Sequence, residues 1–87
     1  MHDLLFHHEA WEDYLYWQTQ DRKTLKRINT LLQDIQRSPF DGMGKPEPLR
    51  GNWSGWWSRR IDDTNRIVYK KEGGTIVIAM CKTHYGN

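Results

Sequence analysis

The chain has 87 residues, a formal net charge of +2, one cysteine and 37% hydrophobic residues. This length allows a single domain, residues 1–87, with a modest core. One cysteine excludes an internal disulfide and a cysteine-rich zinc site, and the longest apolar run, 76–81, is too short to span a bilayer. We therefore expect one small cytoplasmic domain without a membrane segment.

Charge is distributed unevenly along the chain. Residues 1–21 carry five acids and no Lys or Arg, whereas all thirteen basic residues lie between Arg22 and Lys82 beside the other six acids. The net charge is thus about −5 for residues 1–21 and about +7 for the rest of the chain. This asymmetry favours an anionic partner for the basic part. On charge alone, a one-signed solvated helix face is a slightly better explanation.

The first half of the chain predicts one strand and two helices. Residues 4–6 suit an opening strand, and apolar residues 10, 11, 14 and 15 have the spacing of one helix face. The clearest helical periodicity comprises Leu25, Ile28, Leu31, Leu32 and Ile35. Asp21 is suited to cap this second helix, and Ser38-Pro39 to end it. So short a connection predicts an antiparallel helical hairpin.

The second half predicts a long loop followed by three strands. All three prolines and three glycines lie between residues 39 and 52, and long ordered loops are often functional. Strand-like runs follow at 53–61, 66–71 and 75–82, joined by short turns that predict an antiparallel meander. The last run is apolar on both faces and should be central. We expect an α+β fold of order β-α-α-β-β-β, an antiparallel sheet with the helical hairpin packed on one face.

Two arginines of the first hairpin fall on one face if its loop has an odd number of residues. Ile61 and Ile67 then share one face of the sheet, and Arg60 and Arg66 share the other. Two adjacent guanidinium groups repel each other and therefore favour a bound anion. The alternative is that nearby carboxylates neutralise both, and without other evidence we consider that alternative the better one.

Metal and thiol chemistry receive little support, whereas an acid–base pair is available. No histidine or cysteine spacing of a metal site is present, and Cys81 is best explained as a small core residue. Glu47 lies between Pro46 and Pro48, which fix φ and stiffen the loop. His84 follows the last predicted strand, and histidine is the side chain type whose proton moves near neutral pH.

These residues match the requirements of a metal-independent ribonuclease. One group removes the proton of a 2′-hydroxyl, a second protonates the departing 5′-oxygen, and cations stabilise the charged phosphorane. Glu47, His84 and the Arg60/Arg66 pair could fill these roles, and tryptophans 53, 56 and 57 and Tyr85 could stack on unpaired bases. The alternatives are a solvated Glu47, a His84 without function and tryptophans that fill the core.

Several blocks resemble one family closely. They are Trp11–Trp17, Gly44–Leu49, Ser54–Ile61, Arg66–Tyr69 and the His84-Tyr85 pair. Through these blocks the chain resembles, from residue 1 to 85, the YoeB toxins of the RelE/ParE superfamily. The resemblance implies a RelE-like fold related to the microbial ribonucleases.

The resemblance also implies an activity, partners and site residues. YoeB-like toxins are ribosome-dependent endonucleases that cut mRNA in the ribosomal A site without a metal or cofactor, giving 2′,3′-cyclic or 3′-phosphate and 5′-hydroxyl ends. It implies a YefM-type antitoxin and a homodimer as partners. By position, the implied catalytic residues are Glu47 as base, His84 as acid, Arg66 at the phosphate, and Tyr85. The implied RNA or phosphate contacts are Lys45, Arg50, Arg59 and Arg60.

The chain departs from the family pattern in three places, and two other functions stay open. Gly86-Asn87 extend beyond the usual terminal His-Tyr pair, and Met43 and Arg50 stand where lysine is common. One alternative function is a non-catalytic RNA- or protein-binding module with the same basic face. The other, a gyrase-directed toxin like ParE, is disfavoured because those relatives lack the Glu and the terminal His-Tyr arrangement.

Overall fold

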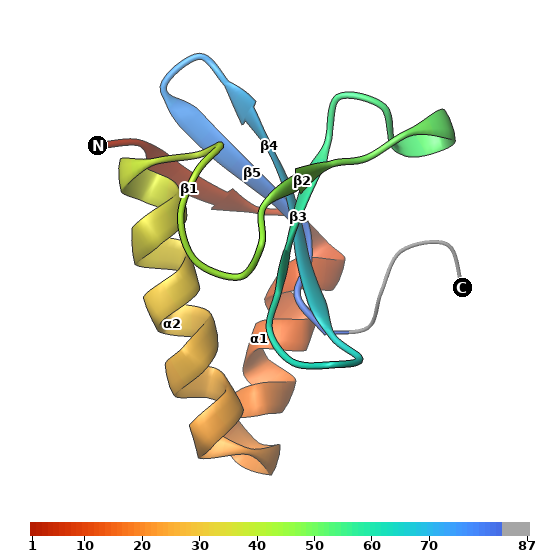
Figure 1. The fold of residues 1–87 in the computed structure, drawn as a ribbon. Helices are drawn as coiled ribbons and strands as arrows, with labels where there is room; N and C mark the ends of the chain where they lie inside the picture. The colour runs from red at the N-terminus through yellow and green to blue at the C-terminus, as the bar shows by residue number, and fades with distance from the viewer. Residues whose placement is uncertain (83–87) are drawn as a thin grey trace.

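The structure, a computed structural model, describes residues 1–82 as two helices beside a five-stranded sheet (Figure 1). The elements in chain order are β1 (Asp3–Phe6), α1 (His8–Gln20), α2 (Arg22–Arg37), β2 (Glu47–Pro48), the 3₁₀ turn η1 (Gly51–Trp53), β3 (Trp57–Arg60), β4 (Arg66–Glu72) and β5 (Thr75–Met80). No helix among these residues is long and apolar enough to cross a membrane.

The helical hairpin forms as the sequence predicts. A single residue, Asp21, separates α1 from α2, and its carboxylate accepts hydrogen bonds from the amides of Lys23 and Thr24 at the start of α2. The helix ends at Arg37, because the Ser38-Pro39 dipeptide disfavours further helical geometry. Four of the five periodic residues of α2 (Ile28, Leu31, Leu32 and Ile35) are buried, and the fifth, Leu25, is partly buried against the core.

The strand order in the sheet is β1-β5-β4-β3-β2. The meander β3-β4-β5 is antiparallel and β5 is central, as predicted, but β1 pairs with β5 in parallel, so the sheet is mixed rather than wholly antiparallel. The helical hairpin supplies the long crossover that a parallel pair requires. Residues 47–48 form a short edge strand that the sequence did not predict, and residues 51–53 form η1 instead of extending β3.

The hydrophobic core lies between the two helices and one face of the sheet. Strands β4 and β5 contribute Ile67, Tyr69, Ile76 and Ile78, and α1 contributes Ala10 and Trp17. Every second side chain of each strand points to the opposite face of the sheet. No α-helix of residues 1–82 packs against that face. We call this second surface the open face.

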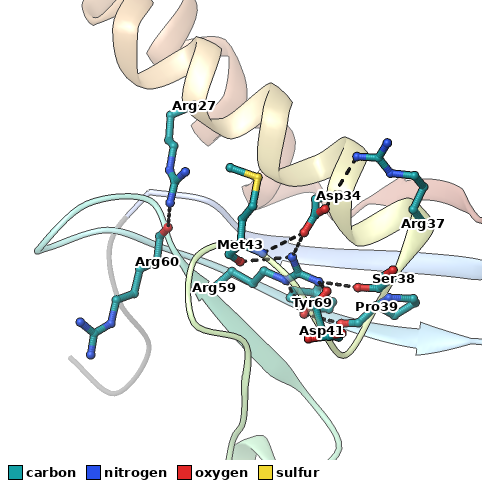
Figure 2. A network of polar contacts seen from close by, with 10 residues as sticks. All are labelled: Arg27, Asp34, Arg37, Ser38, Pro39, Asp41, Met43, Arg59, Arg60 and Tyr69. Atoms are coloured by element: carbon teal, nitrogen blue, oxygen red, sulfur yellow. Dashed lines mark hydrogen bonds and ion pairs between the residues drawn. The ribbon is translucent and has the colours of Figure 1, made fainter.

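A buried charge lies at the edge of this core (Figure 2). Arg59 on β3 is fully buried, its guanidinium forms an ion pair with Asp34 of α2, and its Nε donates a hydrogen bond to the hydroxyl of Tyr69 at 3.1 Å. That hydroxyl in turn donates to the carbonyl oxygen of Pro39 at 2.6 Å. The ion pair thus joins β3 to α2, and the hydrogen bond to Tyr69 joins β3 to β4.

The other guanidinium hydrogen bonds reach the loop of residues 38–46, which leads from α2 to β2. They go to the carbonyl oxygens of Ser38, Asp41 and Met43. With Asp34 and Tyr69, all five N–H donors of Arg59 are therefore engaged. We call these contacts the Arg59 network.

Asp34 is the acidic member of this network, and its ionisation links stability to pH. The amide of Met43 and the guanidinium of Arg59 hold the pKa of Asp34 below 3.8. Because the folded pKa is the lower one, the stability from these contacts is complete above about pH 4 and is lost as the pH falls through the folded value.

Substituting Asp34→Asn should destabilise the fold at neutral pH. The change leaves the guanidinium buried without a counter-charge, so we expect the free energy of unfolding to fall by about 3 kcal/mol, a value reduced for the partial exposure of the carboxylate. Urea unfolding of both proteins measures the difference, which should shrink below about pH 4. A difference that stays constant as the pH falls well below 4 would contradict the assigned ionisation.

Candidate functional site

The register of β3 and β4 determines which residues reach the open face. Arg60 pairs directly with Arg66, so both side chains lie on the same face, whereas Arg59 pairs with Ile67 on the core face. Figure 2 shows the side chains of Arg59 and Arg60 leaving the strand in opposite directions. The structure thus places Arg60 and Arg66 together, as the parity of the hairpin predicted.

Glu47 joins the same face through the short strand β2. It pairs with Ser58, two positions before Arg60, so Glu47 and Arg60 are diagonal neighbours whose α-carbons lie roughly 7–8 Å apart. The amide of Leu49 donates to the carbonyl oxygen of Trp56 at 2.9 Å, and Leu49 is buried. These contacts bring Glu47, Arg60 and Arg66 together on the open face.

The loop that leads into Glu47 has a constrained backbone. The Arg60 amide donates to the carbonyl oxygen of Gly44 at 2.7 Å, and Gly44 has a φ of +77°. A β-carbon at Gly44 would lie 3.0 Å from the Arg60 carbonyl oxygen, so a side chain there would be crowded as well as strained. Lys45 follows with a φ of +52°, uncommon outside glycine. The loop with this backbone conformation leads directly into β2, so Glu47 lies at the edge of the sheet.

The two arginines form no direct ion pair with an acid of residues 1–82, although the Asp62 carboxylate interacts electrostatically with Arg66, so the alternative favoured from the sequence holds only in part. Arg66 donates to the main-chain oxygens of Asp62 and Asn65, at 2.9 and 3.1 Å, and forms no ion pair with a described residue. Arg60 is exposed and likewise has no carboxylate within 4.0 Å in that range. Their positive charge is therefore available to an anion.

The remaining predicted contacts separate into two groups. Lys45 and Arg50 are exposed, on either side of Glu47 in the sequence. Figure 1 shows η1, which directly follows Arg50, at the end of a protrusion that points away from α2. Arg59 is different: it is fully buried and all of its donors are engaged inside the protein. The structure contradicts the expectation that Arg59 binds RNA.

The tryptophans also divide between the core and the surface. Trp57 packs against the core and lies 4.8 Å from the ring of Phe40. Trp53 and Trp56 pair edge-on at 5.6 Å, and the ammonium of Lys70 lies 4.8 Å from the Trp56 ring. An aromatic surface with a cation beside it is suited to stacking with an unpaired base.

The main chain at Cys81, just after β5, is held by two residues of α1. The Cys81 amide donates to the carboxylate of Asp13 at 3.0 Å, and its carbonyl oxygen accepts from the indole of Trp17 at 2.8 Å. Burial raises the pKa of the Cys81 thiol to about 12 and also raises the pKa of the Asp13 carboxyl. Cys81 is a core residue, as predicted. The predicted site residues His84 and Tyr85 lie outside the described residues.

Sequence reasoning missed the residues that support the site from behind. Asp34, Tyr69 and Asp13 bind main chain or the Arg59 guanidinium, and their partners are up to 68 residues away in the sequence. The one available signal was two adjacent arginines on a strand with alternating faces, because one of them has to point into the core and needs a partner there.

The described part of the site can hold an anion between two cations and one carboxylate. Such a site can bind a phosphodiester through Arg60 and Arg66 while Glu47 accepts a proton. Among residues 1–82 no group of three His, Cys, Asp or Glu side chains could hold a metal ion.

Comparison with known proteins identifies the family. A family model for the YoeB-like toxin of bacterial type II toxin–antitoxin systems matches residues 6–85. Toxin YoeB of Streptomyces coelicolor is 55% identical over 82 residues, which cover 94% of this chain and 98% of the relative, and Toxin YoeB of Escherichia coli K12 is 50% identical with the same coverage.

Solved structures agree. The YoeB–YefM complex from Staphylococcus aureus contains a chain with a TM-score of 0.89 and 43% identity, covering 98% of this chain and 99% of that one. A YoeB dimer from the same organism matches with a TM-score of 0.89 and 45% identity, covering 97% and 98%. Together with the arrangement on the open face, these matches show that the chain belongs to the YoeB-like toxins of bacterial type II toxin–antitoxin systems.

Proposed function

We propose that this toxin is a metal-independent endoribonuclease that cuts mRNA in the A site of the translating ribosome. The observation that carries the proposal is the grouping of Glu47, Arg60 and Arg66 on the open face, with neither guanidinium group in an ion pair within 4.0 Å among residues 1–82. Membership of the YoeB-like toxins supports the substrate and the ribosome dependence.

The reaction is an internal transesterification that releases the downstream fragment of the RNA with a 5′-hydroxyl end. Glu47 takes the proton of the 2′-hydroxyl, whose oxygen attacks the adjacent phosphorus, and the bond to the 5′-oxygen breaks. His84 protonates that leaving oxygen, giving a 2′,3′-cyclic phosphate and a 5′-hydroxyl. Arg66, with Arg60 beside it, stabilises the charge on the phosphorane, and Tyr85 completes the catalytic group.

The surfaces outside the reacting groups suit the proposed partners. Lys45 and Arg50 are exposed next to Glu47, where they would contact RNA phosphates. The titles of the Staphylococcus aureus structures name a YoeB–YefM complex and a YoeB dimer, and we propose a YefM-type antitoxin and a homodimer here also. Trp11 and Leu15, 45% and 43% exposed on α1, provide apolar surface for such contacts. The site of action is then the cytoplasm, where ribosomes translate.

Removing the proposed base should abolish cleavage without loss of the fold. Glu47 is an exposed residue, so Glu47→Gln should leave the unfolding midpoint unchanged while the cleavage rate falls by about 100- to 10,000-fold, the usual contribution of a general base. Mapping of 5′-ends in an in-vitro translation reaction measures the rate, and His84→Gln should act in the same direction.

The matched control for this experiment is Glu9→Gln. It removes the same charge from an exposed residue in the first turn of α1, which packs on the core face of the sheet, opposite the open face. It should cleave like the unmodified protein. If Glu47→Gln and His84→Gln both cut at the unmodified rate, the acid–base assignment is wrong. If the unmodified protein binds RNA and never cuts, the chain is a non-catalytic binding module.

The exposed cations should affect substrate binding instead of chemistry. Lys45→Gln or Arg50→Gln should raise KM for programmed ribosomes and reduce its salt dependence, with kcat nearly unchanged, because each removes one phosphate contact. Lys71→Gln on β4 is the control of equal charge change. A fall in kcat with an unchanged KM would show that these cations act in the reaction itself.

A further inference from the structure

Arg59 is unusual because it is a buried cation in β3, between two residues that lie on the face of the proposed site. Ser58 pairs with Glu47, and Arg60 pairs with Arg66, both on the open face. Arg59 lies between them and points to the other side, where it is fully buried. The segment that forms the open face at β3 is therefore fixed from behind by this one side chain.

Stability alone does not account for a cation at this position. A buried ion pair is often no more stabilising than apolar residues of similar volume. A guanidinium differs from any apolar side chain in having five donors in a rigid, planar fork. Here three carbonyl oxygens from different points of the 38–46 loop, those of Ser38, Asp41 and Met43, all lie on that fork. The fork defines the path of the loop.

The defined path ends close to Glu47. Only residues 44–46 separate Met43 from Glu47, and this short segment is itself constrained. The carbonyl oxygen of Gly44 accepts from the Arg60 amide at 2.7 Å, and Pro46 has a fixed φ. A displacement of Met43 is thus passed on to the carboxylate, since little of the intervening chain is free to absorb it.

We propose that Arg59 is the positioning residue for Glu47: its guanidinium fixes the 38–46 loop against β3, so that the carboxylate stands in register with Ser58 and beside Arg60. This role rests on the proposed function, in which Glu47 is the base. It assigns to Arg59 no contact with RNA. Misplacement of a reacting group by about 1 Å can reduce the rate of a reaction about a hundredfold, so a positioning contact has a measurable kinetic effect.

The decisive variant is Arg59→Lys. It keeps a positive charge near Asp34 but loses the planar fork, so the loop carbonyls cannot all be bound. A matched control is a core variant remote from the loop, Ile76→Val or Ile76→Ala, whichever lowers the unfolding midpoint to the same value. Both proteins are compared below their midpoints, where each is folded.

Single-turnover cleavage on programmed ribosomes distinguishes positioning from stability. We expect Arg59→Lys to lower the cleavage rate about 10- to 100-fold, with KM changed less than about threefold, because binding surfaces are intact and only the base has moved. The core variant should cut at the unmodified rate. Equal rates for Arg59→Lys and the core variant would overturn the proposal.

Amide hydrogen exchange gives a readout that does not depend on activity. The amides of Met43, Leu49 and Arg60, which bind Asp34, Trp56 and Gly44, should exchange at least about tenfold faster in Arg59→Lys, while those of β5 keep their protection. If these amides keep their protection, the proposal fails even if the rate falls. If the unmodified protein does not cleave, the proposed function fails, and exchange alone decides whether Arg59 fixes the loop.

A second variant covers the case in which Arg59→Lys does not fold. Tyr69→Phe removes only the hydroxyl that accepts from Arg59 and donates to Pro39. It should show the same pattern to a smaller degree, with faster exchange at Met43 and a lower cleavage rate. Unmodified values for both measurements would overturn the proposal.

Discussion

The buried guanidinium of Arg59 is the interaction on which the arrangement of this small domain depends. A cation inside a protein is costly unless every donor finds an acceptor, and one carboxylate cannot satisfy five donors. Asp34 supplies the counter-charge, and the rest of the demand is met by Tyr69 and by loop carbonyls. An irregular loop of nine residues is thereby given one path, which its own sequence, rich in glycine and proline, does not specify.

Strand β3 links the Arg59 network on one of its faces to the proposed catalytic residues on the other. Side chains of a strand alternate, so the residue that binds the loop and the residues that meet the substrate are neighbours in sequence and point in opposite directions. A slip of one residue would bury Arg60 and expose Arg59, and would remove Ser58 from its pairing with Glu47. The same register of β3 with β2 and β4 therefore places the core residues on one face and the residues of the proposed site on the other.

Much of this structure could be predicted from the sequence, and the failures have identifiable causes. The periodicity of α2, the Asp21 cap and the placing of Arg60 opposite Arg66 follow from local rules, and all are confirmed. The fate of Arg59 could not be predicted, because it is decided by an acid 25 residues away and by carbonyl oxygens, which no side-chain pattern reveals. The parallel pairing of β1 was missed for a similar reason, since the partner strand lies at the other end of the chain.

The main chain is held from the helix side of the sheet at two points, one before Glu47 and one at Cys81. Behind Glu47, α2 contributes Asp34 to the Arg59 network. Ahead of His84, α1 contributes Asp13 and Trp17, which hold the main chain of Cys81 by its amide and its carbonyl oxygen. No α-helix of the described chain covers the open face, which leaves space there for the proposed RNA substrate. A small domain cannot rely on a large core for rigidity, so polar contacts from the helices take over that role at these two points of the main chain.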